Sequence, residues 1–129
     1  MKRIKNYLVL WLYRWLPIIF GCHQMPSRSF YFKKRQFPIC ARCTGELIGI
    51  LISPLIFLIL KSMCLNLSYI LCIILLIPMV IDGTSQYIGL RVSNNSLRLI
   101  TGLLFGLGIS FVVFLTTKDA FQFGKSLYL

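Results

Sequence analysis

Residues 40–60 read CARCTGELIGILISPLIFLIL and join a Cys-x-x-Cys pair to a long apolar run. The run from Thr44 to Leu60 approaches the roughly 20 helical residues that cross a bilayer core of ~30 Å. Two further apolar segments follow, 67–90 with a polar interruption and 97–117. We therefore predict an all-α integral membrane protein with three transmembrane helices.

Composition supports a membrane environment. The chain has 129 residues, of which 57% are hydrophobic, and its mean hydropathy is +0.80, well above what a soluble core of this size needs. Lys and Arg number 14 against 3 acids, which gives a net charge of +11. The basic residues flank apolar runs and do not line one amphipathic face, so we expect anionic lipid headgroups as partners and no nucleic acid. No repeat or linker divides the chain, which predicts one membrane domain over 1–129.

The stretch from Tyr7 to Phe20 is shorter and carries Arg14 together with aromatic residues. This pattern indicates a helix lying in the membrane interface. A spanning helix is the alternative, since residues 4–6 would bring it near membrane length. The end of the stretch also loosely resembles a lipoprotein signal with Cys22 as the lipidated residue, although the bulky Phe20 fits such a signal poorly.

Basic residues predict the topology through the positive-inside rule. With three spans and a cytoplasmic N-terminus, only Lys61, Lys118 and Lys125 lie outside. The Cys-rich loop, 21–43, then lies on the cytoplasmic face of the cell membrane, together with the polar loop between the second and third spans. The two loops can build one site.

The Cys-rich loop has the residue types of a metal site. Cys40 and Cys43 form half of a zinc site just before a helix, where the helix dipole favours thiolates. Cys22 and His23 lie one loop earlier. Adjacent ligands require a sharp turn, so either all four residues bind zinc, or three thiolates bind it with His23, Asp82 or water as the fourth ligand.

Two other interpretations of the cysteines remain open. The two cysteines of a Cys-x-x-Cys motif can also form a redox pair, or they can simply be buried without any ligand. A loop outside the cell would favour the redox pair. Cys64 and Cys72 lie in apolar surroundings, so we predict that these two are buried without ligands.

A second group of polar residues lies within residues 82–102. Asp82 and Gln86 would share a helical face, and an ionisable residue at membrane depth is a functional candidate. The alternative is that Asp82 caps a helix or pairs with Arg91 or Arg98. The turn that follows is rich in donors able to hold a phosphate; its candidate residues are Arg91, Ser93, Asn94, Asn95 and Arg98.

Glu46 lies a few residues into the first span. It is a candidate general acid or base, but pairing with Arg42 one turn earlier is the simpler expectation. Small residues recur every four positions in the first and third spans, which predicts close contact between these helices. They are Gly45, Gly49 and Ser53 in the first span and Gly102, Gly106 and Ser110 in the third.

The motifs CHQMPSRSF, CARCTGE, DGTSQ and NSLRLITG, taken in order, resemble a family of small prokaryotic membrane proteins, domain of unknown function 2085. The resemblance runs from about Gly21 to Gly108 and implies an integral membrane protein. The family has no settled activity, so the resemblance names no substrate. Residues that match its motifs are Cys22, His23, Gln24, Arg28, Ser29, Cys40, Arg42, Cys43, Gly45, Asp82, Gly83, Gln86, Arg91, Ser93, Asn95 and Arg98.

Our leading hypothesis is a membrane metalloprotein with a zinc site at the membrane face, acting on a lipid or isoprenoid-phosphate headgroup. Zinc would activate water or polarise a phosphoryl oxygen. The catalytic candidates are Asp82, Glu46 and Gln86, and the phosphate-binding candidates are Arg28, Arg91, Asn95 and Arg98. The alternatives are a thiol oxidoreductase that couples Cys40 and Cys43 to a quinone, and a non-catalytic membrane subunit with a structural metal.

Overall fold

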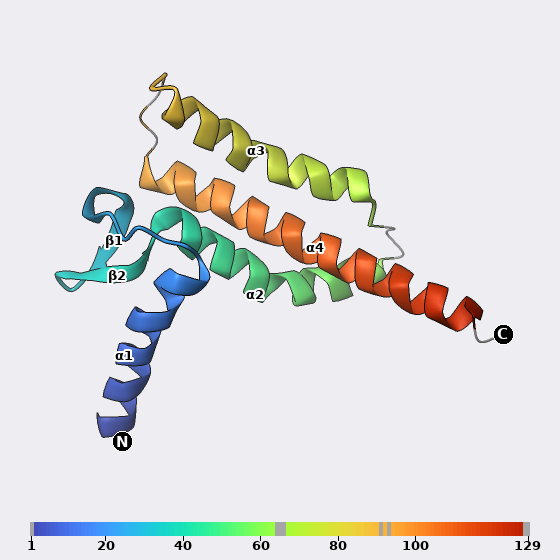
Figure 1. Ribbon diagram of the computed structural model, residues 1–129, viewed down its shortest axis with the longest axis horizontal. Helices are drawn as coiled ribbons and strands as arrows, with labels where there is room; N and C mark the ends of the chain where they lie inside the picture. The colour runs from blue at the N-terminus through green and yellow to red at the C-terminus, as the bar shows by residue number, and fades with distance from the viewer. Residues whose placement is uncertain (1, 64–66, 91, 93, 128–129) are drawn as a thin grey trace.

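The chain folds into a bundle of long helices with a small β-hairpin at one end (Figure 1). The computed structural model describes residues 2–63, 67–90, 92 and 94–127, without the side chains of residues 2–6. In chain order the elements are α1 (Lys2–Ile19), the 3-10 turn η1 (Pro26–Arg28), β1 (Ser29–Phe32), β2 (Arg35–Cys40), α2 (Ala41–Ser62), α3 (Tyr69–Tyr87) and α4 (Asn95–Leu127).

Three helices, α2, α3 and α4, are long and apolar enough to cross a membrane. The predicted helical membrane fold is confirmed, and α4 continues to Leu127, beyond the predicted end of the third span. The apolar part of α1, Tyr7–Ile19, is shorter. In Figure 1, α1 diverges from the other helices, and it contacts the hairpin through Tyr13, whose hydroxyl donates to the Gln36 carbonyl oxygen at 2.8 Å.

Glycines bring α2 and α4 into backbone contact. A Cβ on Gly102 would overlap the carbonyl oxygen of Arg42, and a Cβ on Gly45 would overlap that of Leu99. The same holds one turn further along each helix, so the two helices lie side by side and run in the same direction. The predicted contact between the two small-residue stripes is confirmed.

The α3–α4 interface is built from larger side chains. Cys72 on α3 is fully buried against Phe111 and Leu115 of α4. This confirms the predicted burial of Cys72, whereas Cys64 lies outside the described residues. Ser68 caps the N-terminus of α3: its side chain accepts a hydrogen bond from the Ile70 amide at 3.2 Å, as is typical of an N-cap serine.

The helix directions bring distant polar segments together. Since α3 runs antiparallel to α4, its last turn lies beside the first turn of α4, at the same end of the bundle as the start of α2 and the hairpin (Figure 1). We call this the hairpin end of the bundle, and the opposite side, with the last turns of α2 and α4, the far end. The two polar loops thus meet at one end, as the topology argument predicts.

The hairpin was not predicted. Strands β1 and β2 pair antiparallel, with Tyr31 opposite Gln36, and the turn uses positive φ angles of 48° and 64° at Lys33 and Lys34. Such a turn normally contains Asn-Gly, because few side chains tolerate this backbone conformation. Because the turn contains two lysines instead, the sequence did not indicate a hairpin at this position.

Candidate metal centre

A sharp turn places Cys22 near the start of α2. Gly21 and Gln24 adopt positive φ angles of 55° and 48°, which reverse the chain on either side of Cys22 and His23. Two amide side chains fix the turn on β2: Gln24 donates to the Pro38 carbonyl oxygen at 3.0 Å, and Gln36 donates to the Gln24 carbonyl oxygen at 2.9 Å.

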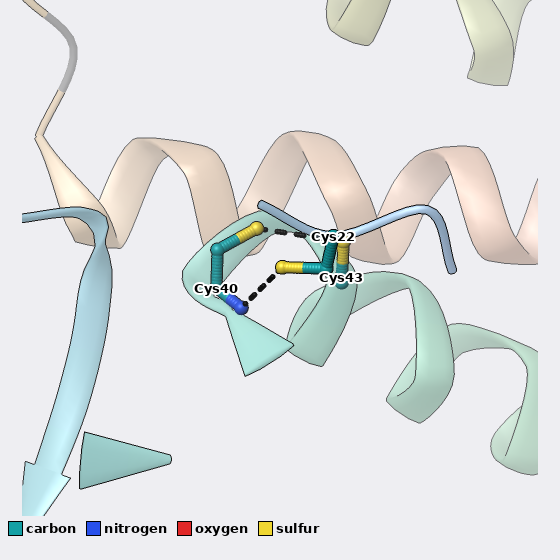
Figure 2. Close-up of side chains that lie close together, drawn as sticks. All are labelled: Cys22, Cys40 and Cys43. Carbon is teal, nitrogen blue, oxygen red and sulfur yellow. Dashed lines mark hydrogen bonds between the residues drawn. The ribbon is translucent and has the colours of Figure 1, made fainter. Parts of the chain in front are cut away.

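The Cys cluster comprises Cys22, Cys40 and Cys43, whose sulfur atoms all lie within 4.8 Å of one another (Figure 2). Cys40 ends β2 and occupies the position before the first residue of α2, which places Cys43 one turn later in α2. The sulfurs of Cys40 and Cys43 are 3.4 Å apart, and the Cys40 amide donates to the Cys22 sulfur at 3.1 Å.

These distances fit a metal bound by thiolates. A tetrahedral ion with Zn–S bonds of ≈ 2.3 Å holds its sulfurs about 3.8 Å apart. Small side-chain rotations would therefore bring all three sulfurs to ligand distance. The backbone N–H aimed at Cys22 and the N-terminus of α2 both stabilise negative sulfur, which a thiolate ligand requires.

The environment of Cys40 already favours its thiolate. Hydrogen bonds, above all the one with the Cys43 side chain, lower the pKa of the Cys40 thiol from 9.0 to about 5, against the opposing effect of partial burial. Of the two thiols in this pair, that of Cys40 is therefore the one that loses its proton more readily.

His23 does not join the Cys cluster. Among the described residues, only the three cysteines form a group of three or more ligand atoms within metal-binding distance. The His23 side chain is exposed and lines the cavity beside the cluster. The four-ligand alternative therefore does not form in this arrangement.

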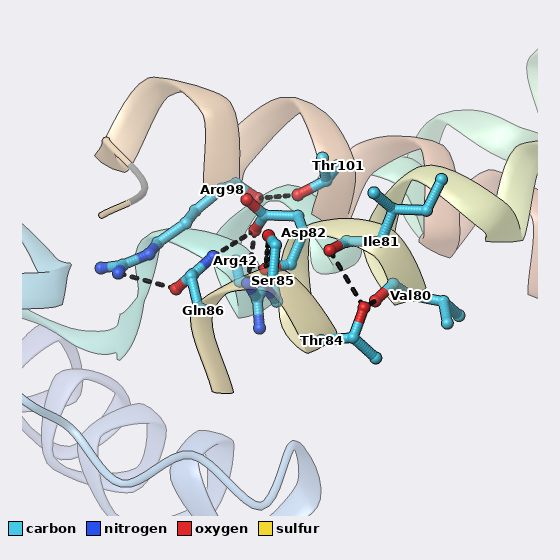
Figure 3. A network of polar contacts seen from close by, with 9 residues as sticks. All are labelled: Arg42, Val80, Ile81, Asp82, Thr84, Ser85, Gln86, Arg98 and Thr101. Carbon is cyan, nitrogen blue, oxygen red and sulfur yellow. Dashed lines mark hydrogen bonds and ion pairs between the residues drawn. The ribbon is translucent and has the colours of Figure 1, made fainter. Parts of the chain in front are cut away.

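A buried carboxylate, that of Asp82 on α3, belongs to a network of polar contacts at the hairpin end (Figure 3). Asp82 is only 6% exposed, and its Oδ2 accepts from the Arg42 guanidinium at 2.5 Å and from the Gln86 amide at 2.7 Å. Arg98 in turn donates to Gln86 Oε1 at 2.9 Å. The chain of contacts links α2, α3 and α4, and the predicted shared face of Asp82 and Gln86 is confirmed.

Two predicted pairings are corrected. Arg42 forms its ion pair with Asp82 and not with Glu46, and the Asp82 carboxylate is bound by Arg42 and not by Arg98. The reason is burial: a carboxylate with almost no water contact gains more from a guanidinium than the half-buried Glu46 does. The other predicted partner, Arg91, lies outside the described residues, as does Ser93.

One cavity of about 180 Å³ joins the Cys cluster to three guanidinium groups. We call Arg28, Arg42 and Arg98 the arginine wall. Gln86 and His23 also line this cavity, whereas Glu46 and Asn95 are not among its lining residues. Sequence reasoning missed Arg42 as a cavity residue because it assigned this side chain to Glu46. The order of the motifs along the chain gave no signal for the correct partner.

Comparison with known sequences identifies the chain's relatives. A family described as "Predicted membrane protein (DUF2085)" matches residues 22–112. The chain belongs to this family. An uncharacterized protein of Methanocaldococcus jannaschii is 44% identical over 71% of this chain and 60% of its own length. An uncharacterized protein of Methanothermobacter thermautotrophicus is 39% identical over 69% of this chain and 80% of its own length.

No solved structure matches the chain significantly. The DUF2085 match begins at Cys22 and so contains the Cys cluster, the Asp82 network and the whole arginine wall. It excludes α1 and the last part of α4. The matched segment therefore contains every residue of the cavity except Gly21.

Proposed function

We propose that this membrane protein binds zinc through the Cys cluster and uses the arginine wall to bind the phosphate headgroup of a lipid or isoprenoid phosphate beside the metal. One observation carries the proposal: three converging sulfurs and three guanidinium groups line the same cavity of about 180 Å³ at one end of a membrane bundle. Elsewhere in membrane helices such polar groups are rare, because each is costly to bury.

The donor set favours zinc among metals. Thiolates are soft ligands that select Zn²⁺ or Cu⁺ over Mg²⁺ and Ca²⁺, and sites with three protein ligands keep the fourth position for water or substrate. When bound there, zinc supplies Lewis acidity to a phosphoryl oxygen or lowers the pKa of a bound water.

The arginine wall suits phosphate. Arg98 reaches the cavity from α4 and Arg42 from α2, while Arg28 comes from η1 beside the hairpin. Guanidinium groups bind phosphate oxygens through paired hydrogen bonds, and their convergence from separate elements gives a fixed geometry. A cavity of this size accommodates a headgroup and leaves the lipid chains in the bilayer.

Asp82 then acts as a positioning residue. Its Oδ2 is shared between Arg42 and Gln86, and Gln86 orients Arg98. The carboxylate thereby holds two members of the arginine wall toward the cavity. Glu46 lies one turn after Arg42 on α2 but does not line the cavity, so we assign it no contact with the phosphate.

Metal analysis of protein purified in detergent without chelator tests the zinc site. We expect about one zinc per chain, lost in Cys40→Ser and Cys22→Ser and retained in Cys72→Ala, which removes a thiol far from the cavity. His23→Gln is also expected to retain zinc, since its side chain lies outside the cluster. Metal-free protein, or equal metal loss in Cys72→Ala, would contradict the proposal.

Titration with a short-chain phosphatidic acid in micelles tests the phosphate site. Arg98→Gln removes a charged donor, so we expect about tenfold weaker binding in the zinc-loaded protein. Arg35→Gln, at the exposed hairpin, is the matched control and should bind as the unsubstituted protein does. Unchanged affinity in Arg98→Gln excludes the arginine wall as the binding site.

Cytoplasmic placement of the hairpin end, in the cell membrane, is part of the proposal. It rests on the excess of basic residues at this end. In intact cells, an impermeant maleimide should label Lys118→Cys at the far end and leave Lys34→Cys at the hairpin unlabelled. The reverse labelling pattern would place the cavity outside.

A thiol oxidoreductase is the second candidate, because the Cys40 and Cys43 sulfurs are 3.4 Å apart and the Cys40 pKa is lowered to about 5. Oxidation of this dithiol to a disulfide would pass two electrons and two protons to an acceptor such as a quinone. Purified protein with a Cys40–Cys43 disulfide and no metal would favour this function over zinc binding.

A further inference from the structure

The far end of the bundle contains a second and larger cavity. Its volume is about 900 Å³, and it lies between the last turns of α2 and the C-terminal half of α4. Phe57 and Phe114 pack against each other in its lining, with ring centroids 5.1 Å apart. The cavity is separate from the Cys cluster, which lies at the hairpin end.

Lysines rim this apolar lining. Lys61 comes from the last turn of α2, and Lys118 and Lys125 lie two turns apart on α4. All three are exposed, and no carboxylate lines the cavity among the described residues. The neighbouring acid on α4, Asp119, bonds instead to Tyr69 of α3 at 2.5 Å.

Phe121 marks the boundary between the apolar lining and the lysines. It is 77% exposed and lies between Lys118 and Lys125 in sequence, and all three residues line the cavity. Exposed aromatic rings next to lysines are typical of headgroup depth in a membrane. The cavity thus has an apolar part that extends toward the bilayer centre and a cationic rim at the surface.

We propose that this cavity binds one anionic phospholipid, with an acyl chain against Phe57 and Phe114 and the phosphate among Lys61, Lys118 and Lys125. Charge complementarity selects this occupant: three cations without a lining acid favour an anionic headgroup over a zwitterionic one. The volume falls in the range of sites that enclose most of a ligand of a few dozen atoms. This lipid site is independent of the zinc and phosphate chemistry at the hairpin end.

Tryptophan quenching by brominated lipids tests the site. The chain's two tryptophans, Trp11 and Trp15, lie in α1 and are replaced by Phe, and Phe121→Trp serves as the reporter at an exposed position. The protein is reconstituted in vesicles that mix phosphatidylcholine with phosphatidylglycerol, with one or the other lipid brominated. From the quenching by each brominated lipid we expect the site to prefer phosphatidylglycerol over phosphatidylcholine by about fivefold or more.

Charge removal completes the test. Lys118→Gln with Lys125→Gln should reduce the preference to near onefold, whereas Lys33→Gln with Lys34→Gln, at the hairpin, should leave it unchanged. Equal quenching by the two lipids, or a preference that survives the loss of both α4 lysines, would overturn the proposal. Neither readout depends on metal. A negative result in the quenching experiment therefore does not affect the proposed zinc site, and a negative result in the metal analysis does not affect the proposed lipid site.

Discussion

The hairpin end and the far end of the same bundle hold their helices together by different means. At the hairpin end, Asp82 and Arg42 are joined across α2 and α3 by an ion pair and hydrogen bonds. Toward the far end, Cys72, Phe111 and Leu115 pack without any polar contact among them. A stability argument alone favours the apolar arrangement, because buried charges seldom repay their desolvation. The buried polar contacts of the hairpin end therefore need another explanation than stability, and our proposed zinc and phosphate site offers one.

A bulky residue in place of a glycine at the α2–α4 contact should have the largest effect on stability. Gly102→Leu would overlap the Arg42 carbonyl oxygen and separate α2 from α4 along their whole contact. We expect a loss of more than about 3 kcal/mol or failure to fold, measured by chemical unfolding in detergent. Gly124→Leu is the matched control, since a Cβ at Gly124 meets nothing within 4 Å. Equal stability of the two variants would refute the tight α2–α4 contact.

Breaking the buried ion pair should have the second-largest effect on stability. Asp82→Asn leaves the Arg42 guanidinium without its counter-charge, and we expect a cost of ~3 kcal/mol in unfolding free energy. The double variant Asp82→Asn with Arg42→Gln should recover part of this loss, because it removes both charges. If the double variant is as unstable as the sum of its single variants, the two side chains do not interact.

Metal removal should destabilise the hairpin end specifically. A ligand at a hundred times its Kd stabilises a folded protein by ≈ 2.7 kcal/mol, so zinc-loaded protein should unfold at a higher temperature than chelator-treated protein. Cys40→Ser should show no such difference, whereas the far-end variant Cys72→Ala should keep it. A chelator effect that persists in Cys40→Ser would place the metal elsewhere.

The smallest effect is expected at the surface of the far end. Tyr69→Phe removes the hydrogen bond to Asp119, but both side chains are exposed and water replaces the lost contact. The thermal midpoint should change by little more than the error of the measurement. A large loss of stability would mean that the far end also depends on polar contacts.

The sequence predicted the spanning helices because long Leu- and Ile-rich runs have few alternatives in a membrane. It also predicted the α2–α4 contact, since glycines four residues apart point to close backbone approach. It did not predict the hairpin, whose turn places two lysines in a conformation they rarely adopt.

Partner choice was harder to predict. Asp82 lies forty residues from Arg42, and local spacing favoured Glu46 as the arginine's partner. Only the packing of α2, α3 and α4 brings Asp82 within reach and excludes water from it. Similarly, the sequence left open whether Cys22 and His23 both bind the metal, because adjacent ligands require a sharp turn. The chain does turn at Gly21 and Gln24, but His23 lies outside the Cys cluster.

The glycine contact between α2 and α4 also limits how the cavity can move. Two helices whose backbones pack this closely have little room to slide or rotate past each other, so we expect Cys43 on α2 and Arg98 on α4 to move together. We expect any widening of the cavity to come from a tilt of α3, which would first break the ion pair between Asp82 and Arg42. Paired spin labels would report this as a changing α3–α4 distance at a constant α2–α4 distance, and the opposite result would exclude it.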